Sequence, residues 1–156
     1  METTTPIRPT GQQQHLRRIP LTAEPAAAAE ARTEVRAAIF AWDLPVDSSV
    51  AVLLTSELVT NAIRHEAGQA ILLDIACGCG QLRVDVHDTC RSRPALVNAP
   101  ADAETGRGLM LVASLSDDWG CYRTQAGKAV YFELAYQADA GEDGGCSPRD
   151  SDSCVW

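Results

Sequence analysis

The sequence SVAVLLTSELVTNAIRH at residues 49–65 decides the fold, because it predicts a helix with apolar residues on two sides. At about 100° per residue, the apolar residues fall into two stripes on opposite sides of this helix. The first stripe holds Val50, Leu53, Leu54 and Leu58, and the second holds Val52, Val59 and Ile63. Glu57 and Asn61, four residues apart, lie in the middle of the first stripe. We therefore expect this helix to be packed on both sides, with a polar pair inside one packed face.

Glu57 and Asn61 are the first candidates for chemistry. A lone buried carboxylate costs several kcal/mol unless it is paired or protonated, so Glu57 needs a partner. One reading is a core hydrogen-bond network to an arginine or a backbone amide. The other is a pair of oxygen ligands facing one Mg²⁺ and its waters. His65 continues the same face, where a histidine near a helix C-terminus is more often a partner of the helix dipole than a ligand.

The segments around this helix predict the order β-α-α-β-β-loop-α-β-β. A strand at 16–22 and a helix at 24–42 precede the central helix, which runs from about 49 to 66 and is capped by Asp47 or Ser48. Two hairpins follow, 71–77 with 81–88 and 118–124 with 129–136, separated by a loop at 89–105 and a helix at 106–116. One face of the sheet should be polar and solvent-exposed and the other buried, because apolar residues alternate with Arg83, Asp85 and His87.

This order predicts an α+β two-layer sandwich. We expect a mixed, mainly antiparallel sheet of four to five strands, covered on one face by about three helices. The 156 residues fit one domain at 15–137, between a disordered tail at 1–14 and a disordered acidic tail at 138–156.

Charge and composition exclude several classes of partner. The net charge of −8 is the opposite of what binding to a nucleic-acid backbone requires. The N-terminal region has no apolar signal-peptide core, and no run approaches the roughly 20 apolar residues of a membrane span. The six cysteines include no C-x-x-C pair, so we expect no zinc site. We expect a cytoplasmic protein that contacts neither nucleic acid nor membrane.

Two further motifs point to a nucleotide. Asp88 ends a strand, where it is either a turn former or a carboxylate that accepts from the exocyclic amine of adenine. Thr105, Gly106, Arg107 and Gly108 stand directly before an apolar helix. Two glycines at a helix start let the backbone approach an anion, although a capped flexible turn uses the same residues.

Taken together, these motifs resemble the histidine-kinase-like ATPase superfamily. The segment 57–65 is similar to its N-box, Asp88 lies where its adenine-binding acid falls, and residues 106–109 are similar to its second glycine box. The segment GKAVYFEL at 127–134 is similar to its final strand. In size, the chain is most similar to small anti-sigma-factor serine/threonine-protein kinases.

The resemblance implies an ATP site with assigned roles. Glu57 would be the general base, Asn61 would hold Mg²⁺ on the phosphates, and Asp88 would take the adenine amine. Thr105, Gly106 and Gly108 would wrap the triphosphate, and Arg107 would offset its charge. Two departures stand out: the segment DTCRSRP at 88–94 lacks the usual glycines, and Ala129 stands where many relatives have a small hydroxyl residue near the adenine.

The implied function is a regulator of transcription that uses ATP and Mg²⁺. It would bind a sigma factor and transfer the ATP γ-phosphoryl group to a serine or threonine of an antagonist (anti-anti-sigma) protein. A homodimer is left open. One alternative is a non-catalytic module that binds a partner with ATP or without any nucleotide. Another is a detached histidine-kinase catalytic domain, which is weaker because no helix with a phosphoacceptor histidine precedes the fold.

Overall fold

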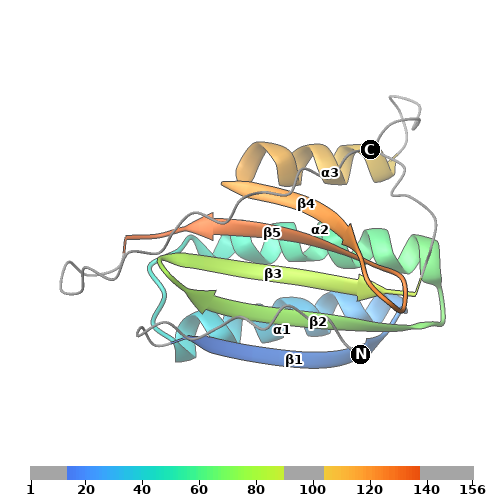
Figure 1. The fold of residues 1–156 in the computed structure, drawn as a ribbon, viewed down its shortest axis with the longest axis horizontal. Helices are drawn as coiled ribbons and strands as arrows, with labels where there is room; N and C mark the ends of the chain where they lie inside the picture. Colours follow the sequence, from blue (N-terminus) through green and yellow to red (C-terminus); the bar gives the residue numbers. More distant parts are fainter. Residues whose placement is uncertain (1–13, 90–103, 138–156) are drawn as a thin grey trace.

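The computed structural model describes residues 14–89 and 104–137, in the predicted order of elements (Figure 1). They are β1 (His15–Thr22), α1 (Pro25–Ala41), α2 (Ser48–Glu66), β2 (Ala70–Gly78), β3 (Gln81–Asp88), α3 (Glu104–Leu115), β4 (Asp118–Arg123) and β5 (Lys128–Ala135). The predicted tails and nearly all of the predicted loop at 89–105 lie outside the described residues. None of the helices within the described ranges is long and apolar enough to cross a membrane.

The sheet has five strands in the order β1-β2-β3-β5-β4. Each neighbouring pair of these strands is antiparallel, so the sheet is not mixed, whereas the α+β sandwich itself is as predicted. The chain leaves β3, passes through α3 to the outer strand β4, and returns in β5, which pairs with β3. This return places the start of β5 beside the end of β3, with Asp88 opposite Lys128.

The three helices form the second layer. α1 contacts β1 and β2, α2 contacts β3 and β5, and α3 lies against α2 and β4. In Figure 1, α1 and α2 lie behind the sheet, and α3 runs beside β4. α2 is therefore the central helix with neighbours on both sides, as its two apolar stripes predict. Leu53 departs from the prediction: 38% of it is exposed.

The hydrophobic core lies between the sheet and α2. Its largest fully buried side chains come from both layers, and they include Leu54, Leu58, Leu73, Ile75, Leu82 and Phe132. The Asp47 carboxylate accepts hydrogen bonds from the Ser49 and Val50 amides, at 2.9 and 3.3 Å, and so caps α2. Because α2 is capped at its start and buried on both sides, it is a rigid support for the polar side chains that it carries.

The turn between β2 and β3 is a two-residue hairpin. Cys79 and Gly80 both have positive φ, 55° and 72°, as a type I′ turn requires. This turn fixes the pairing register of β2 and β3, and with it the side of the sheet that each residue of β3 faces.

Candidate functional site

The first part of the site is the contact between α2 and α3. Gly108 of α3 lies so close to α2 that a Cβ atom at this position would overlap the Oε2 atom of Glu57. Within the described part of the chain, no hydrogen bond or ion pair joins Glu57 to an arginine. The arginine network that the sequence left open for Glu57 is therefore not formed there.

Asn61 lies one turn further along α2. The residue is 6% exposed, and its Oδ1 atom has no hydrogen-bond partner. A buried carbonyl oxygen without a partner costs about 1–3 kcal/mol, so its retention points to a ligand. An amide oxygen next to a carboxylate suits a hard cation such as Mg²⁺.

The donor set around Asn61 fits a metal that is bound mainly through phosphate. Among the described residues, no group of three His, Cys, Asp or Glu side chains converges. Mg²⁺ commonly takes one or two protein oxygens and completes its shell with water and substrate phosphates. Asn61 would therefore hold the ion only when a nucleotide brings the remaining ligands.

The second part of the site is a buried ion pair at the ends of β3 and β5. The Nζ atom of Lys128 lies 3.8 Å from the Oδ2 atom of Asp88, and the two residues are 4% and 5% exposed. A Cβ atom at Gly127 would overlap the Asp88 carbonyl, so a glycine is needed to bring the two chain segments together. Asp88 thus faces the helix layer with a cation beside it.

In β5, the residue that lies opposite Asp88 is Lys128 and not Ala129. Ala129 pairs with His87, whereas Lys128 pairs with Asp88, and side chains alternate between the two faces of a sheet. Ala129 therefore lies on the face away from Asp88, and the residue beside the acid is Lys128. The sequence pattern predicted Lys128 in the turn before this strand. The one sequence feature that could have singled it out is that the chain has no other lysine.

The end of α2 brings His65 to the same place. Partial burial lowers the pKa of His65, the Lys128 charge lowers it further, and the Asp88 charge partly opposes both. The Thr89 hydroxyl donates a hydrogen bond of 2.9 Å to Glu66, which ties the end of β3 to the end of α2. His65 is in the last turn of α2, as expected for a partner of the helix dipole, and it also lies near the ion pair.

The glycine motif forms the start of α3. The helix begins at Glu104, two residues before the predicted start, so Thr105, Gly106, Arg107 and Gly108 belong to its first turns. Amide groups in the first turn have no partner within the helix and favour anions. The side chains of Thr105 and Arg107 lie outside the described part.

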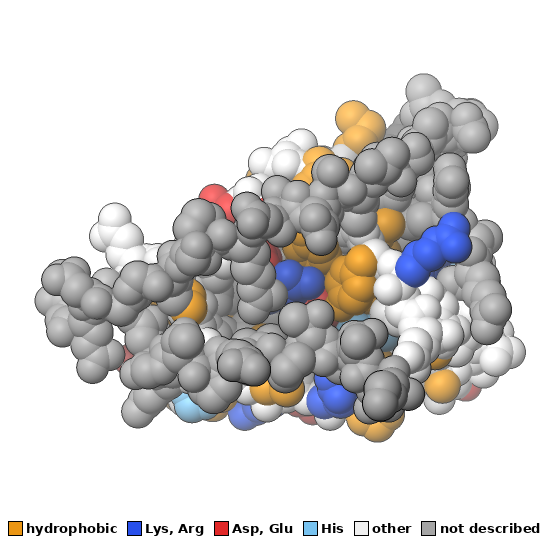
Figure 2. Space-filling model, viewed as in Figure 1, with side chains coloured by type: hydrophobic (Ala, Val, Ile, Leu, Met, Phe, Trp, Pro, Cys, Tyr) orange, Lys and Arg blue, Asp and Glu red, His pale blue; other side chains and the backbone are white. Residues whose placement is uncertain are grey.

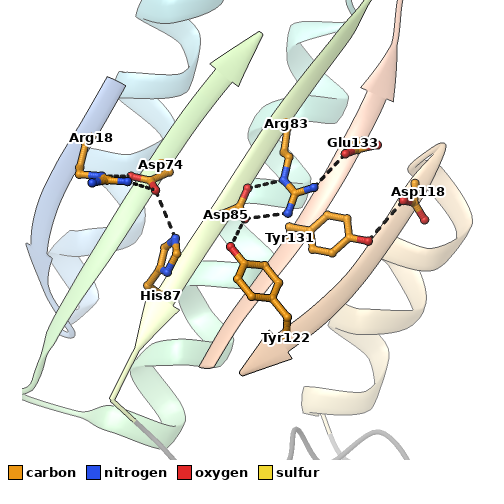
Figure 3. Close-up of polar contacts among 9 residues, drawn as sticks. All are labelled: Arg18, Asp74, Arg83, Asp85, His87, Asp118, Tyr122, Tyr131 and Glu133. Carbon is orange, nitrogen blue, oxygen red and sulfur yellow. Dashed lines mark hydrogen bonds and ion pairs between the residues drawn. The ribbon is translucent and has the colours of Figure 1, made fainter. Parts of the chain in front are cut away.

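A separate polar cluster lies on the sheet face that the helices leave uncovered (Figure 3). Arg83 donates to Asp85 at 2.8 and 3.0 Å and to Glu133 at 3.1 Å, and the Tyr122 hydroxyl donates to Asp85 at 2.6 Å. The guanidinium also lies 3.9 Å from the centre of the Tyr131 ring. In the space-filling view, basic and hydrophobic side chains lie side by side at the centre of this face (Figure 2). Its charges satisfy one another, so we regard this cluster as structural.

Comparison with known proteins identifies the family of this chain. A family model described as the histidine kinase-like ATPase domain matches residues 21–134, which is most of the chain. This chain belongs to that family. No curated protein matches it. The matched range of this histidine kinase-like ATPase contains all the candidate site residues.

A solved structure shares the fold of this histidine kinase-like ATPase. It is the crystal structure of the RsbU and RsbW domains of Rv1364c from Mycobacterium tuberculosis, with a TM-score of 0.58 and 20% sequence identity. The match covers 78% of this chain and 32% of that one, so this chain spans about a third of that protein. At this identity the likeness concerns the fold. The family itself implies an ATP site, for which Asn61, Glu57 and the start of α3 are the candidates.

Proposed function

We propose that this chain is an ATP-dependent serine/threonine kinase that phosphorylates an antagonist protein and binds a sigma factor. The observation that carries this proposal is the buried Oδ1 atom of Asn61, which has no partner and lies one turn from Glu57. Family membership supports ATP as the nucleotide. The RsbW domain in the similar structure supports the choice of a regulatory kinase.

Each site residue has one task in the proposed reaction. A serine hydroxyl of the antagonist attacks the γ-phosphorus, the bond from that phosphorus to the β–γ bridging oxygen breaks, and ADP leaves. Glu57 accepts the proton of the attacking hydroxyl. Mg²⁺, when bound, neutralises charge on the phosphates, and Asn61 supplies a protein oxygen to it. The amides at the start of α3, including Gly106 and Gly108, bind phosphate oxygens.

The base and charge contacts complete the proposed site. Asp88 accepts a hydrogen bond from the 6-amino group of adenine. Thr105 and Arg107 lie at the start of α3, where a hydroxyl and a guanidinium would bind phosphate oxygens and offset their charge. Because the reaction needs positioning more than covalent chemistry, small displacements of these groups should cost much of the rate.

Transfer of labelled phosphate tests the kinase step. The protein is mixed with Mg²⁺, γ-labelled ATP and candidate antagonist domains, and label on the antagonist is measured for the wild type and for Glu57→Gln. We expect a loss of about 100-fold or more in Glu57→Gln with ATP binding retained, since a general base typically contributes 10²–10⁴-fold. Glu34→Gln on α1 is the control. Unchanged transfer in Glu57→Gln would remove Glu57 from the mechanism.

Nucleotide binding tests the role of Asn61 separately. In the wild type, Mg²⁺ should strengthen ATP binding measured by calorimetry, and Asn61→Ala should lose this gain while still binding ATP in EDTA. Binding of ATP and a sigma factor without any transfer would favour the alternative, a non-catalytic binding module. Light scattering on the same samples decides whether the chain is a homodimer.

A further inference from the structure

Lys128 is a buried amine whose hydrogen-bond donors are unused. It is 4% exposed, and its Nζ atom has no hydrogen-bond partner. An ammonium carries three donors, and burying them without acceptors costs free energy even when a carboxylate lies nearby. The distance of 3.8 Å to Asp88 allows ionic attraction but not a hydrogen bond. The ammonium is therefore poised to donate to something else.

The position of Lys128 places that acceptor in the candidate nucleotide site. Lys128 and Asp88 face each other across β5 and β3 and point to the helix side of the sheet. His65, at the end of α2, lies close enough for both charges to act on its pKa. Asn61, with its unpartnered oxygen, is one turn earlier on the same helix. A ligand of this site would meet an acceptor, Asp88, directly beside a donor, Lys128.

Adenine has the complementary arrangement on its edges. Its 6-amino group is a donor, and the ring nitrogens on either side of that group, N1 and N7, are acceptors. A carboxylate alone contacts only the amino group, whereas a carboxylate beside an ammonium contacts the amino group and one neighbouring ring nitrogen. The charges of the pair also cancel, so a neutral base can cover them without leaving one buried charge alone.

We propose that Lys128 is a base-reading residue: it donates to the adenine ring nitrogen next to the amino group that Asp88 accepts from. This inference rests on the proposed function, because it takes the nucleotide to be ATP. In the same orientation, guanine would direct its O6 at the carboxylate, which is repulsive, and on the N1 side it would also direct its N1–H at the ammonium. With the base in this orientation, Asp88 and Lys128 together therefore favour adenine over guanine.

ATP analogues in which one ring nitrogen is replaced by carbon test the contact between Lys128 and the base directly. Binding of Mg²⁺ with ATP, 1-deaza-ATP, 7-deaza-ATP and GTP is measured by calorimetry for the wild type and for Lys128→Met. In the wild type, we expect one of the two deaza analogues to bind with an affinity about tenfold or more below that of ATP. The reason is that hydrogen bonds to charged groups contribute about 1.5–3 kcal/mol. In Lys128→Met this difference should disappear. GTP should bind the wild type more weakly than ATP.

Two controls separate base reading from folding. Arg123→Met removes the same charge from the residue opposite Lys128 on β4, where the side chain is exposed, and should leave all four affinities unchanged. A second measurement needs no variant: with lysine labelled at its ε-carbon, the chain gives one side-chain NMR signal, because Lys128 is its single lysine. Mg²⁺ with ATP should shift this signal, and Mg²⁺ with tripolyphosphate should not.

The possible failures are distinguishable. A wild-type protein that binds no ATP overturns the proposed function together with this inference. If ATP binds but both deaza analogues bind equally well and the lysine signal does not move, the base-reading role is wrong and the proposed function stands. GTP binding as tight as ATP binding overturns the selection of adenine.

Discussion

Gly108 leaves the space that the carboxylate of Glu57, the proposed general base, occupies. A Cβ atom there would overlap the Glu57 carboxylate. Alanine is favoured over glycine in a helix by about 1 kcal/mol, so only this overlap opposes the substitution. We expect Gly108→Ala to displace the flexible end of Glu57, keep the fold and reduce phosphate transfer about tenfold or more, because a misplaced general base loses much of its effect.

A double-mutant cycle checks that expectation. In a Glu57→Ala background the overlap is gone, so Gly108→Ala should raise the free energy of unfolding by about 1 kcal/mol, measured with urea. In the wild-type background the gain should be smaller. Equal gains in both backgrounds would mean that the two residues do not touch in solution.

Residue by residue, the sequence predicted the part of the candidate site that rests on local spacing. Glu57 and Asn61 share a helix face, and Asp88 ends a strand, and both facts follow from periodicity. Lys128 could not be found in this way. A shift of one residue in the pairing register of β5 would reverse the face of each of its side chains, and the pairing of Asp88 with Lys128 shows that register only in the folded sheet.

At the scale of elements, α2 carries both Glu57 and Asn61, and its start depends on Asp47. The carboxylate accepts hydrogen bonds from two first-turn amides, at Ser49 and Val50. We expect Asp47→Ala to lower the free energy of unfolding by about 1 kcal/mol, and Asp47→Asn to change it much less, because asparagine also caps helices. Urea denaturation measures both variants. A loss of the same size in Asp47→Asn would show that charge, not the cap, stabilises the helix.

The elements also show where sequence reasoning ends. Strands, helices and both hairpins follow from local patterns, such as the two positive-φ residues Cys79 and Gly80 between β2 and β3. The start of α3 was placed two residues late, because the glycines at 106 and 108 disfavour a helix locally. The order β1-β2-β3-β5-β4 depends on pairing between segments that are distant in the chain, which periodicity does not encode.

At the scale of the whole molecule, the sheet separates two kinds of polar chemistry. On the helix side, Asn61 and Lys128 retain polar atoms without a hydrogen-bond partner, which suits a ligand site, whereas His87 Nε2 on the other side lacks such a bond but lies 3.2 Å from Asp74. On the other side, Arg83, Asp85 and Glu133 are joined by hydrogen bonds. Their mutual pairing explains how a sheet without helices on this face can keep charged residues largely buried.

All three tyrosines of the chain bear on how this molecule responds to alkali. Burial and then the Asp118 charge raise the pKa of Tyr131 to about 12. Burial and then the Asp85 charge raise the pKa of Tyr122, and burial with the nearby Cys77 raises that of Tyr136. In the unfolded chain tyrosine ionises near pH 10. Between about pH 10 and pH 12, the unfolded state therefore loses protons that the folded state keeps.

The free energy of unfolding should consequently be unaffected by these groups below about pH 10 and fall as the pH rises toward 12. Phenolate absorbance followed through an alkaline titration should rise near pH 10 in urea, but in the native protein only at higher pH, together with the loss of helical circular dichroism. Tyr131→Phe removes one shifted group, so its stability should fall less steeply over the same pH range. Phenolates of Tyr122 and Tyr131 that form near pH 10 in the native protein would mean that these two rings are not held in the polar cluster on the uncovered sheet face, because burial and the neighbouring carboxylates keep them protonated.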